Sequence, residues 1–118
     1  MERDAELPPP LEMVCLCALW RLGEGTVADV RREATGQKAL AYTTVLTLLD
    51  RLTRRGAVAR RKEGRSFRYR PSVAREVMRK RALARFLTAH FDGSVEELQK
   101  FLNNGRVPAA NAFAAHSS

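Results

Sequence analysis

The side chains of this chain that could do chemistry are mostly basic, and most of them fall in one window. Thirteen of its 21 lysines and arginines lie between Arg51 and Arg81, where Glu63 and Glu76 are the only acidic residues, so the window carries a net charge of +11. The first fifty residues carry −3, and the residues after Arg81 sum to zero. A one-signed cationic surface attracts polyanions, and nucleic acid is the usual one. The charge distribution therefore favours nucleic-acid binding.

The sequence gives little support for catalysis or metal binding. The chain contains no glycine-rich phosphate loop, no GxSxG and no HExxH, and His90 and His116 stand alone. We therefore predict no enzymatic activity, no metal and no cofactor. Cys15 and Cys17 lie in an apolar run, and on a helix they would point about 200° apart. We interpret both as small buried hydrophobic residues, and the alternative is a redox or metal switch joined across a dimer.

Membrane insertion is not indicated. The longest apolar run, Met13 to Trp20, has eight residues, whereas a membrane span needs roughly 18. The N-terminus starts with acidic residues followed by three prolines, which is unlike a secretory signal. We expect a cytoplasmic protein with no membrane partner. Binding to an anionic membrane surface is the competing interpretation of the charge, but it requires a basic amphipathic helix.

The first half of the chain has the periodicity of three helices. Residues 11–22 are apolar almost all round, which predicts a helix buried on most sides. Thr26 to Asp29 fits a capping box that opens a second helix. The third helix is expected over 41–55, with Thr43, Thr47 and Arg54 opposite its apolar face. That face consists of Val45, Leu48, Leu49 and Leu52.

A β-hairpin and two further helices follow. Residues 57–62 and 66–70 alternate as strands, and we expect Val58 to point inward, with Arg60 and Lys62 outward. Ser72 is a plausible N-cap for a helix over 73–91. Ser94 to Glu97 fits a second capping box, which opens a short helix ending near Leu102.

This order of elements predicts a mainly α fold with a small β-hairpin wing. It is a winged helix-turn-helix followed by a short helical dimerisation region. We expect a flexible leader at 1–10, the DNA-binding domain at 11–71, the dimerisation region at 72–103 and a disordered tail at 104–118.

In such a fold the third helix enters the major groove. Thr43, Thr44 and Thr47 are expected to approach base edges, and basic residues from the helix end and the wing to contact phosphates. Asp50 is expected to pair with Arg54. The candidate phosphate contacts are Arg51, Arg54, Arg55, Arg60, Arg61, Lys62, Arg65 and Arg68.

Several segments together resemble the penicillinase-repressor (BlaI/MecI/CopY) family of bacterial repressors. The resemblance covers roughly residues 11–102, and the order and spacing of the segments make it fairly specific. The segments are Glu12-Met13-Val14 with Leu19-Trp20, Thr26-Val27-Ala28-Asp29-Val30, Ala41-Tyr42-Thr43-Thr44-Val45 with Thr47-Leu48 and Arg51-Leu52, Tyr69-Arg70-Pro71, and Asp92-Gly93-Ser94.

The resemblance implies a homodimer that binds a palindromic DNA operator and represses transcription. It places dimerisation in the last two helices, through Leu83, Phe86, Leu87, Phe91, Leu98 and Phe101. It also implies inactivation by a sensor protease, with Lys100–Phe101 as the cleaved bond. The alternative is a winged-helix RNA-binding or protein-interaction module without operator specificity.

Three departures from the family pattern bear on these expectations. Leu46 stands where some members carry a long basic side chain, so one base contact is missing. Members usually continue with another helix after residue 105, whereas this chain has a tail of small residues. The copper-responsive branch carries a C-terminal cysteine cluster, and this chain has no cysteine beyond Cys17, which excludes metal sensing by that route.

Overall fold

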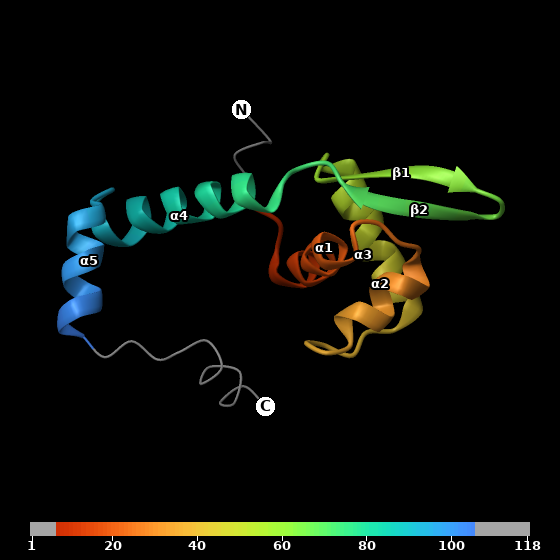
Figure 1. The fold of residues 1–118 in the computed structure, drawn as a ribbon, viewed down its shortest axis with the longest axis horizontal. Helices are drawn as coiled ribbons and strands as arrows, with labels where there is room; N and C mark the ends of the chain where they lie inside the picture. The colour runs from red at the N-terminus through yellow and green to blue at the C-terminus, as the bar shows by residue number, and fades with distance from the viewer. Residues whose placement is uncertain (1–6, 106–118) are drawn as a thin grey trace. The chain divides into compact units, whose positions relative to one another are not determined.

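The computed structural model describes residues 7–105, which form five helices and one two-stranded antiparallel sheet (Figure 1). The described residues divide into two compact units, with the division between residues 81 and 82. The elements in chain order are α1 (Pro10–Leu22), α2 (Val27–Ala34), α3 (Tyr42–Arg54), β1 (Val58–Glu63), β2 (Ser66–Pro71), α4 (Arg75–Phe91) and α5 (Val95–Asn104).

Helix α1 begins at Pro10 because proline fits the first helical position, and Gly23 ends it with a positive φ of 87°. Its buried residues are Glu12, Cys15, Leu16, Ala18 and Leu19. The expected burial on most sides is therefore wrong in part, because Leu11 and Leu22 at the two ends are 40% and 38% exposed. The carboxylate of Glu12, only 3% exposed, instead occupies an interior position.

Both predicted features of α2 are confirmed. The Thr26 side chain accepts from the Asp29 amide, and the Asp29 carboxylate accepts from the Thr26 amide at 3.0 Å. The backbone hydrogen bond from Thr26 lowers the pKa of Asp29 below its usual value, because hydrogen bonding favours the charged form. Val27, Val30 and Ala34 form the buried stripe.

Helix α3 has the amphipathic character expected from its sequence. Val45, Leu48, Leu49 and Leu52 are all buried, and they pack in the same core as α1 and α2. Its observed bounds lie one residue inside the expected range of 41–55 at each end. The opposite face of α3 is left to solvent.

Strands β1 and β2 pair with a two-residue loop at Gly64 and Arg65, since Glu63 is the partner of Ser66. Tyr69 also bridges to Gly25: each amide donates to the other's carbonyl, at 2.8 and 2.9 Å. The loop before α2 is thereby fixed beside the hairpin.

One expectation about the hairpin is wrong. Residues two apart share a face of a strand, so Arg60 and Lys62 lie on the same face as inward-pointing Val58. The register confirms this arrangement, because Arg60 pairs with Tyr69 and Lys62 with Phe67. Both basic side chains are nevertheless exposed.

Tyr69 is the largest fully buried side chain, and its hydroxyl has no hydrogen-bond partner within the described part of the chain. A buried unsatisfied hydroxyl costs about 1 kcal/mol or more. We therefore expect Tyr69→Phe to stabilise the protein by about 1 kcal/mol and to raise its Tm by a few degrees. Thermal unfolding followed by circular dichroism measures this. A lower Tm would mean that the hydroxyl is bonded in solution.

Helix α4 starts at Arg75, two residues later than expected, and Ser72 is not its cap. The Val73 carbonyl accepts from Trp20 Nε1 at 2.9 Å, and the first helical bond runs from the Met78 amide to the Ala74 carbonyl. Met78 is buried in the core of the first unit. The early turns of α4 thus belong to that unit, and the division at residues 81 and 82 falls inside the helix rather than at 71 and 72.

Helix α5 has half of its expected capping box. Ser94 Oγ accepts from the Glu97 amide at 3.1 Å, but the Glu97 carboxylate pairs with Lys100 at 3.6 Å rather than reaching back. The helix runs to Asn104, two residues beyond the expected Leu102, and none of its residues is buried.

The expected leader and tail lie largely outside the described residues, namely in 1–6 and 106–118, which include His116. Residues 7–10 do not behave as a flexible leader, because Leu7 packs against the core, Pro8 is buried and Pro10 is helical. None of the five helices described for residues 7–105 combines the length and apolar character that crossing a membrane requires.

Candidate nucleic-acid interface

The exposed face of α3 carries short hydroxyl side chains followed by arginines. Thr43 and Thr47 are exposed, and Thr44 is partly exposed. The Thr47 hydroxyl donates to the Thr43 carbonyl at 3.0 Å, a common local bond for threonine in a helix. Its oxygen lone pairs and its methyl group remain available to a base edge.

Toward the end of α3 this face becomes basic. Arg51 is exposed, and the side chain of Arg54 is 77% exposed. Arg54 Nη2 lies 2.9 Å from Asp50 Oδ2, so the predicted pair between helical neighbours four apart is confirmed. The guanidinium of Arg54 still has donors directed at solvent, since an arginine carries five N–H groups.

Arg55 has a different role from the one expected. Its Nε donates to Glu12 Oε1 at 2.8 Å, and its Nη2 reaches Glu12 Oε2 at 3.4 Å. Its side chain is 27% exposed. The fork geometry satisfies both carboxylate oxygens of a buried acid. Arg55 therefore joins α3 to α1 rather than facing the solvent with the other arginines of this segment.

Two wing arginines, Arg61 and Arg68, pair with carboxylates of the wing and of the loop before α2. Arg61 Nη1 lies 3.3 Å from Glu24, and Arg68 lies 3.0 Å from Glu63 and 3.9 Å from Glu24. The hydrogen bond that Arg68 donates to Glu63 raises the pKa of Arg68 above its already high usual value. Glu24, at the loop before α2, was not identified from the sequence, because its contacts depend on the bridge between Gly25 and Tyr69.

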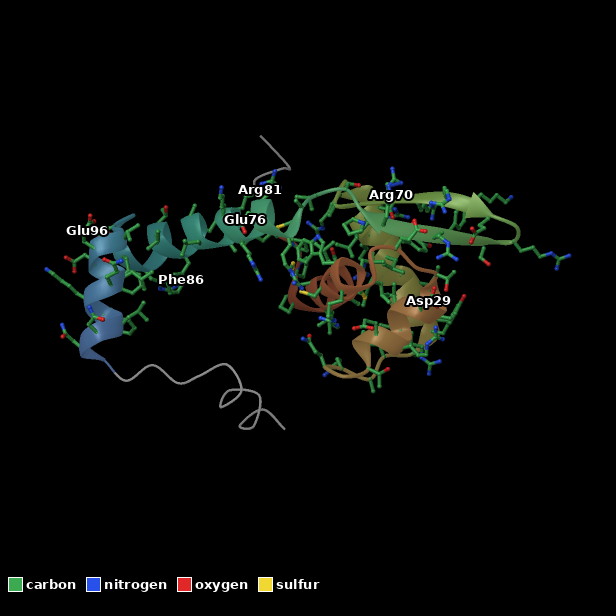
Figure 2. All side chains as sticks on the ribbon, viewed as in Figure 1. Asp29, Arg70, Glu76, Arg81, Phe86 and Glu96 are labelled. Carbon is green, nitrogen blue, oxygen red and sulfur yellow. The ribbon has the colours of Figure 1, made fainter. Side chains whose placement is uncertain are left out.

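The remaining wing bases are directed to solvent. Lys62 and Arg65 are exposed near the loop of the hairpin, and within residues 7–105 no carboxylate lies within 4.0 Å of either. Arg70, also exposed, extends away from the ribbon of β2 (Figure 2). Arg70 is not among the phosphate contacts predicted from the sequence, although it lies within the basic window between Arg51 and Arg81.

Arg60 connects the wing to α3. Its guanidinium carbon lies 4.2 Å from the centre of the Phe67 ring, and its Nη1 lies 3.9 Å from Asp50 Oδ1. Asp50 belongs to the exposed side of α3 that also carries Arg54. The face of the hairpin that carries Arg60 therefore meets the exposed side of α3 at Asp50.

The cysteines do not contribute to this surface. Cys15 is fully buried, and burial raises the pKa of its thiol to about 11, which keeps it protonated and unreactive at neutral pH. Cys17 is partly exposed. Within residues 7–105, no group of three or more His, Cys, Asp or Glu side chains could hold a metal ion. The thiol chemistry of Cys15 argues against the redox alternative.

The second unit contains the expected dimerisation residues. The ring of Phe91 lies 5.5 Å from those of Phe86 and Phe101, and Figure 2 shows Phe86 on the side of α4 toward α5. Leu87 is already buried in the single chain, at 8% exposed, and Phe91 and Leu98 are half-buried. The apolar residues left exposed are Leu83, Phe86, Val95, Phe101 and Leu102.

Three helices followed by a two-stranded wing, with a polar and basic third helix, define a winged-helix protein. The sequence matches the penicillinase repressor family model over residues 9–111, and the chain belongs to this family. That family consists of transcriptional repressors rather than enzymes.

Individual relatives agree with this assignment. Transcriptional regulator BlaI from two Mycobacterium tuberculosis strains is 36% identical over 67 residues, which cover 56% of this chain. The chain spans about half the length of these curated relatives, at 49%. The solution structure of the DNA-binding domain of the repressor BlaI is 26% identical, with a TM-score of 0.52, over 59% of this chain and 88% of that one.

The fold extends to a more distant protein. The structure of Bordetella bronchiseptica BpsR covers 92% of this chain and 71% of its own, with a TM-score of 0.51. Its sequence is 22% identical, so the similarity concerns the fold alone.

Proposed function

We propose that this chain is a cytoplasmic DNA-binding transcriptional repressor, with α3 in the major groove and the wing on the flanking backbone. The observation that carries the proposal is the Arg60–Asp50 contact at 3.9 Å. It makes the hydroxyl and arginine face of α3 continuous with a basic wing, as groove binding requires. Thr43, Thr44 and Thr47 face the bases, and Arg51, Arg54, Lys62 and Arg65 supply cations for phosphates.

We further propose that the chain acts as a homodimer on a palindromic operator. Helix α5 has its apolar residues on one side, yet none is buried. Exposed apolar patches of this kind mark association sites. Two copies related by a twofold axis would present two α3 helices to successive major grooves, and the operator would share that symmetry.

Relief of repression by a sensor protease is the last part of the proposal. Lys100–Phe101 lies inside α5, and a helical bond must unwind before a protease can cleave it. In a single chain α5 has no buried residues and opens at low free-energy cost, so it is suited to cleavage whenever the dimer dissociates. Cutting there would prevent the dimer from forming again and weaken operator binding.

The proposal is tested by measuring binding of the full chain to duplex DNA, single-stranded DNA and RNA over a salt series. We expect preference for duplex, with affinity falling steeply as salt rises, because each neutralised phosphate contributes about 0.9 to the log–log slope. Stronger binding to single strands or RNA would favour the alternative winged-helix RNA-binding module. Absence of nucleic-acid binding would favour a protein-interaction module.

Thr47→Ala is expected to change which sequences bind more than how tightly they bind. A threonine reads a base edge through its hydroxyl or methyl, and each such contact is worth about 1–3 kcal/mol of discrimination. Selection from a random duplex pool should show relaxed preference at one position of each half-site. Arg54→Ala is the comparison variant, and it should weaken all sequences and reduce the salt slope by about 1. An unaltered sequence preference in Thr47→Ala would mean that another face of α3 reads the bases.

A further inference from the structure

The carboxylate of Asp50 joins the two elements of the proposed interface. Its Oδ2 lies 2.9 Å from Arg54 Nη2 on the same helix, and its Oδ1 lies 3.9 Å from Arg60 Nη1 on β1. Each carboxylate oxygen therefore serves a different arginine from a different element. The Asp50 side chain is 35% exposed, so this negative charge lies at the surface between two cations.

Arg60 is held from a second direction by an aromatic ring. Its guanidinium carbon lies 4.2 Å from the centre of the Phe67 ring, which is a favourable cation–π distance. The strand register accounts for the contact, since Phe67 pairs with Lys62 on the face that carries Arg60. The Arg60 side chain is 36% exposed, against 77% for Arg54. Arg60 is thus more enclosed by the protein than Arg54.

We propose that Asp50 is a positioning residue that sets the sequence specificity of DNA binding. This inference rests on the proposed function. Asp50 restrains Arg54 and Arg60, so these two side chains lose less freedom when they contact a DNA backbone of matching shape. Its negative charge also opposes contact with phosphates in other positions, and such repulsion against wrong partners is a general source of specificity.

A structural role alone would not explain the arrangement. Exposed ion pairs contribute little to folding stability, because solvent screens them and ordering two long side chains costs entropy. The consequence of the Arg54–Asp50–Arg60 contact should therefore be visible in DNA binding. Asp50 cannot simply strengthen that binding, since it reduces the positive charge of the surface.

The test compares the wild-type chain with Asp50→Asn, Arg60→Ala and the double variant. Each binds a duplex selected by the wild type from a random pool, and a scrambled duplex of the same composition. We expect Asp50→Asn to bind the scrambled duplex about fivefold more tightly, with a log–log salt slope steeper by about 1, because the released arginines gain a phosphate contact. Binding to the selected duplex should not improve, so the specificity ratio falls about fivefold or more. The Tm should stay within two degrees or so of the wild type.

Two controls make the result specific. Glu33→Gln removes the same charge from an ion pair between α1 and α2, with Arg21 at 2.7 Å, and should leave the ratio unchanged. In the Arg60→Ala background, Asp50→Asn should have a smaller effect if it acts through Arg60. An unchanged ratio in Asp50→Asn, an equal change in Glu33→Gln, or an undiminished effect without Arg60 would each overturn the inference. A wild-type chain with no duplex preference would instead overturn the proposed function, and this inference with it.

Discussion

Replacing Leu83 by glutamate is expected to convert a dimer of this chain into monomers and to weaken binding to a palindromic operator by about 100-fold or more. Leu83 lies on α4 and is 48% exposed in the single chain, so the change should leave the fold of the monomer intact. In the proposed dimer its side chain would be covered by the partner. A carboxylate buried there without a partner costs several kcal/mol, which lowers the association constant by about two to three orders of magnitude.

The loss of DNA binding follows from the loss of the linked second site. Two α3 helices in one dimer bind as a bivalent ligand, and this avidity is worth about 10²–10⁴ over a single half-site. Sedimentation equilibrium gives the mass, and titration of a palindromic duplex gives the affinity. A half-site duplex should be bound equally by the variant and the wild type.

The matched control is Ala89→Glu. Ala89 is an exposed residue of the same helix, about 120° around the axis from Leu83, and it receives the same charge. Ala89→Glu should stay dimeric. Leu83 is a better probe than Leu87, which is already buried in the single chain and would report on folding. A dimeric Leu83→Glu chain would show that the interface lies elsewhere.

The helices could be predicted from the sequence where their stability depends on local pattern. The apolar face of α3 follows from residue spacing, because its apolar residues recur three or four positions apart along one helix. The Thr26–Asp29 capping box is likewise a bond between residues three apart. The hydroxyl and arginine face of α3 follows from the same geometry.

The structure departs from the expectations based on sequence where a contact joins residues that are far apart in the chain. Trp20 fixes the Val73 carbonyl across 53 residues, and this bond delays the start of α4 beyond any position that local capping rules indicate. Leu7 packs against a core that only the assembled helices create. The face of Arg60 depends on no such contact, because the two-residue period of a strand already places it on the face of Val58.

The residues of the proposed interface are likewise only partly predictable, because their exposure depends on contacts between distant parts of the chain. A count of basic residues identifies the segment of the proposed interface, yet charge alone does not say which arginine meets solvent. Arg61 and Arg68 lie against Glu24, and Arg55 lies against Glu12. These acids come from the first 24 residues, and only the folded chain brings them to the basic segment.

The Glu12–Arg55 pair leads to the second large effect. We expect Glu12→Leu to destabilise the protein by about 2–3 kcal/mol. Breaking a buried ion pair from one side costs about 3–5 kcal/mol, because the remaining charge has lost the opposite charge that faced it. We take a lower value here since the Arg55 side chain is 27% exposed and water can solvate part of it. Urea denaturation, with the midpoint and slope both fitted, measures the change.

The double variant Glu12→Leu with Arg55→Met distinguishes two effects: the loss of the ion pair itself, and the cost of leaving the Arg55 charge uncompensated. Replacing both partners with apolar residues of similar size is often neutral or stabilising, so the double variant should recover most of the lost stability. Arg55 forms the C-cap of α3, directly before the turn into β1, so the single variant should also loosen the junction between α3 and the wing. If Glu12→Leu were as stable as the wild type, the pair would not hold α1 and α3 together, and α3 would depend on its aliphatic face alone.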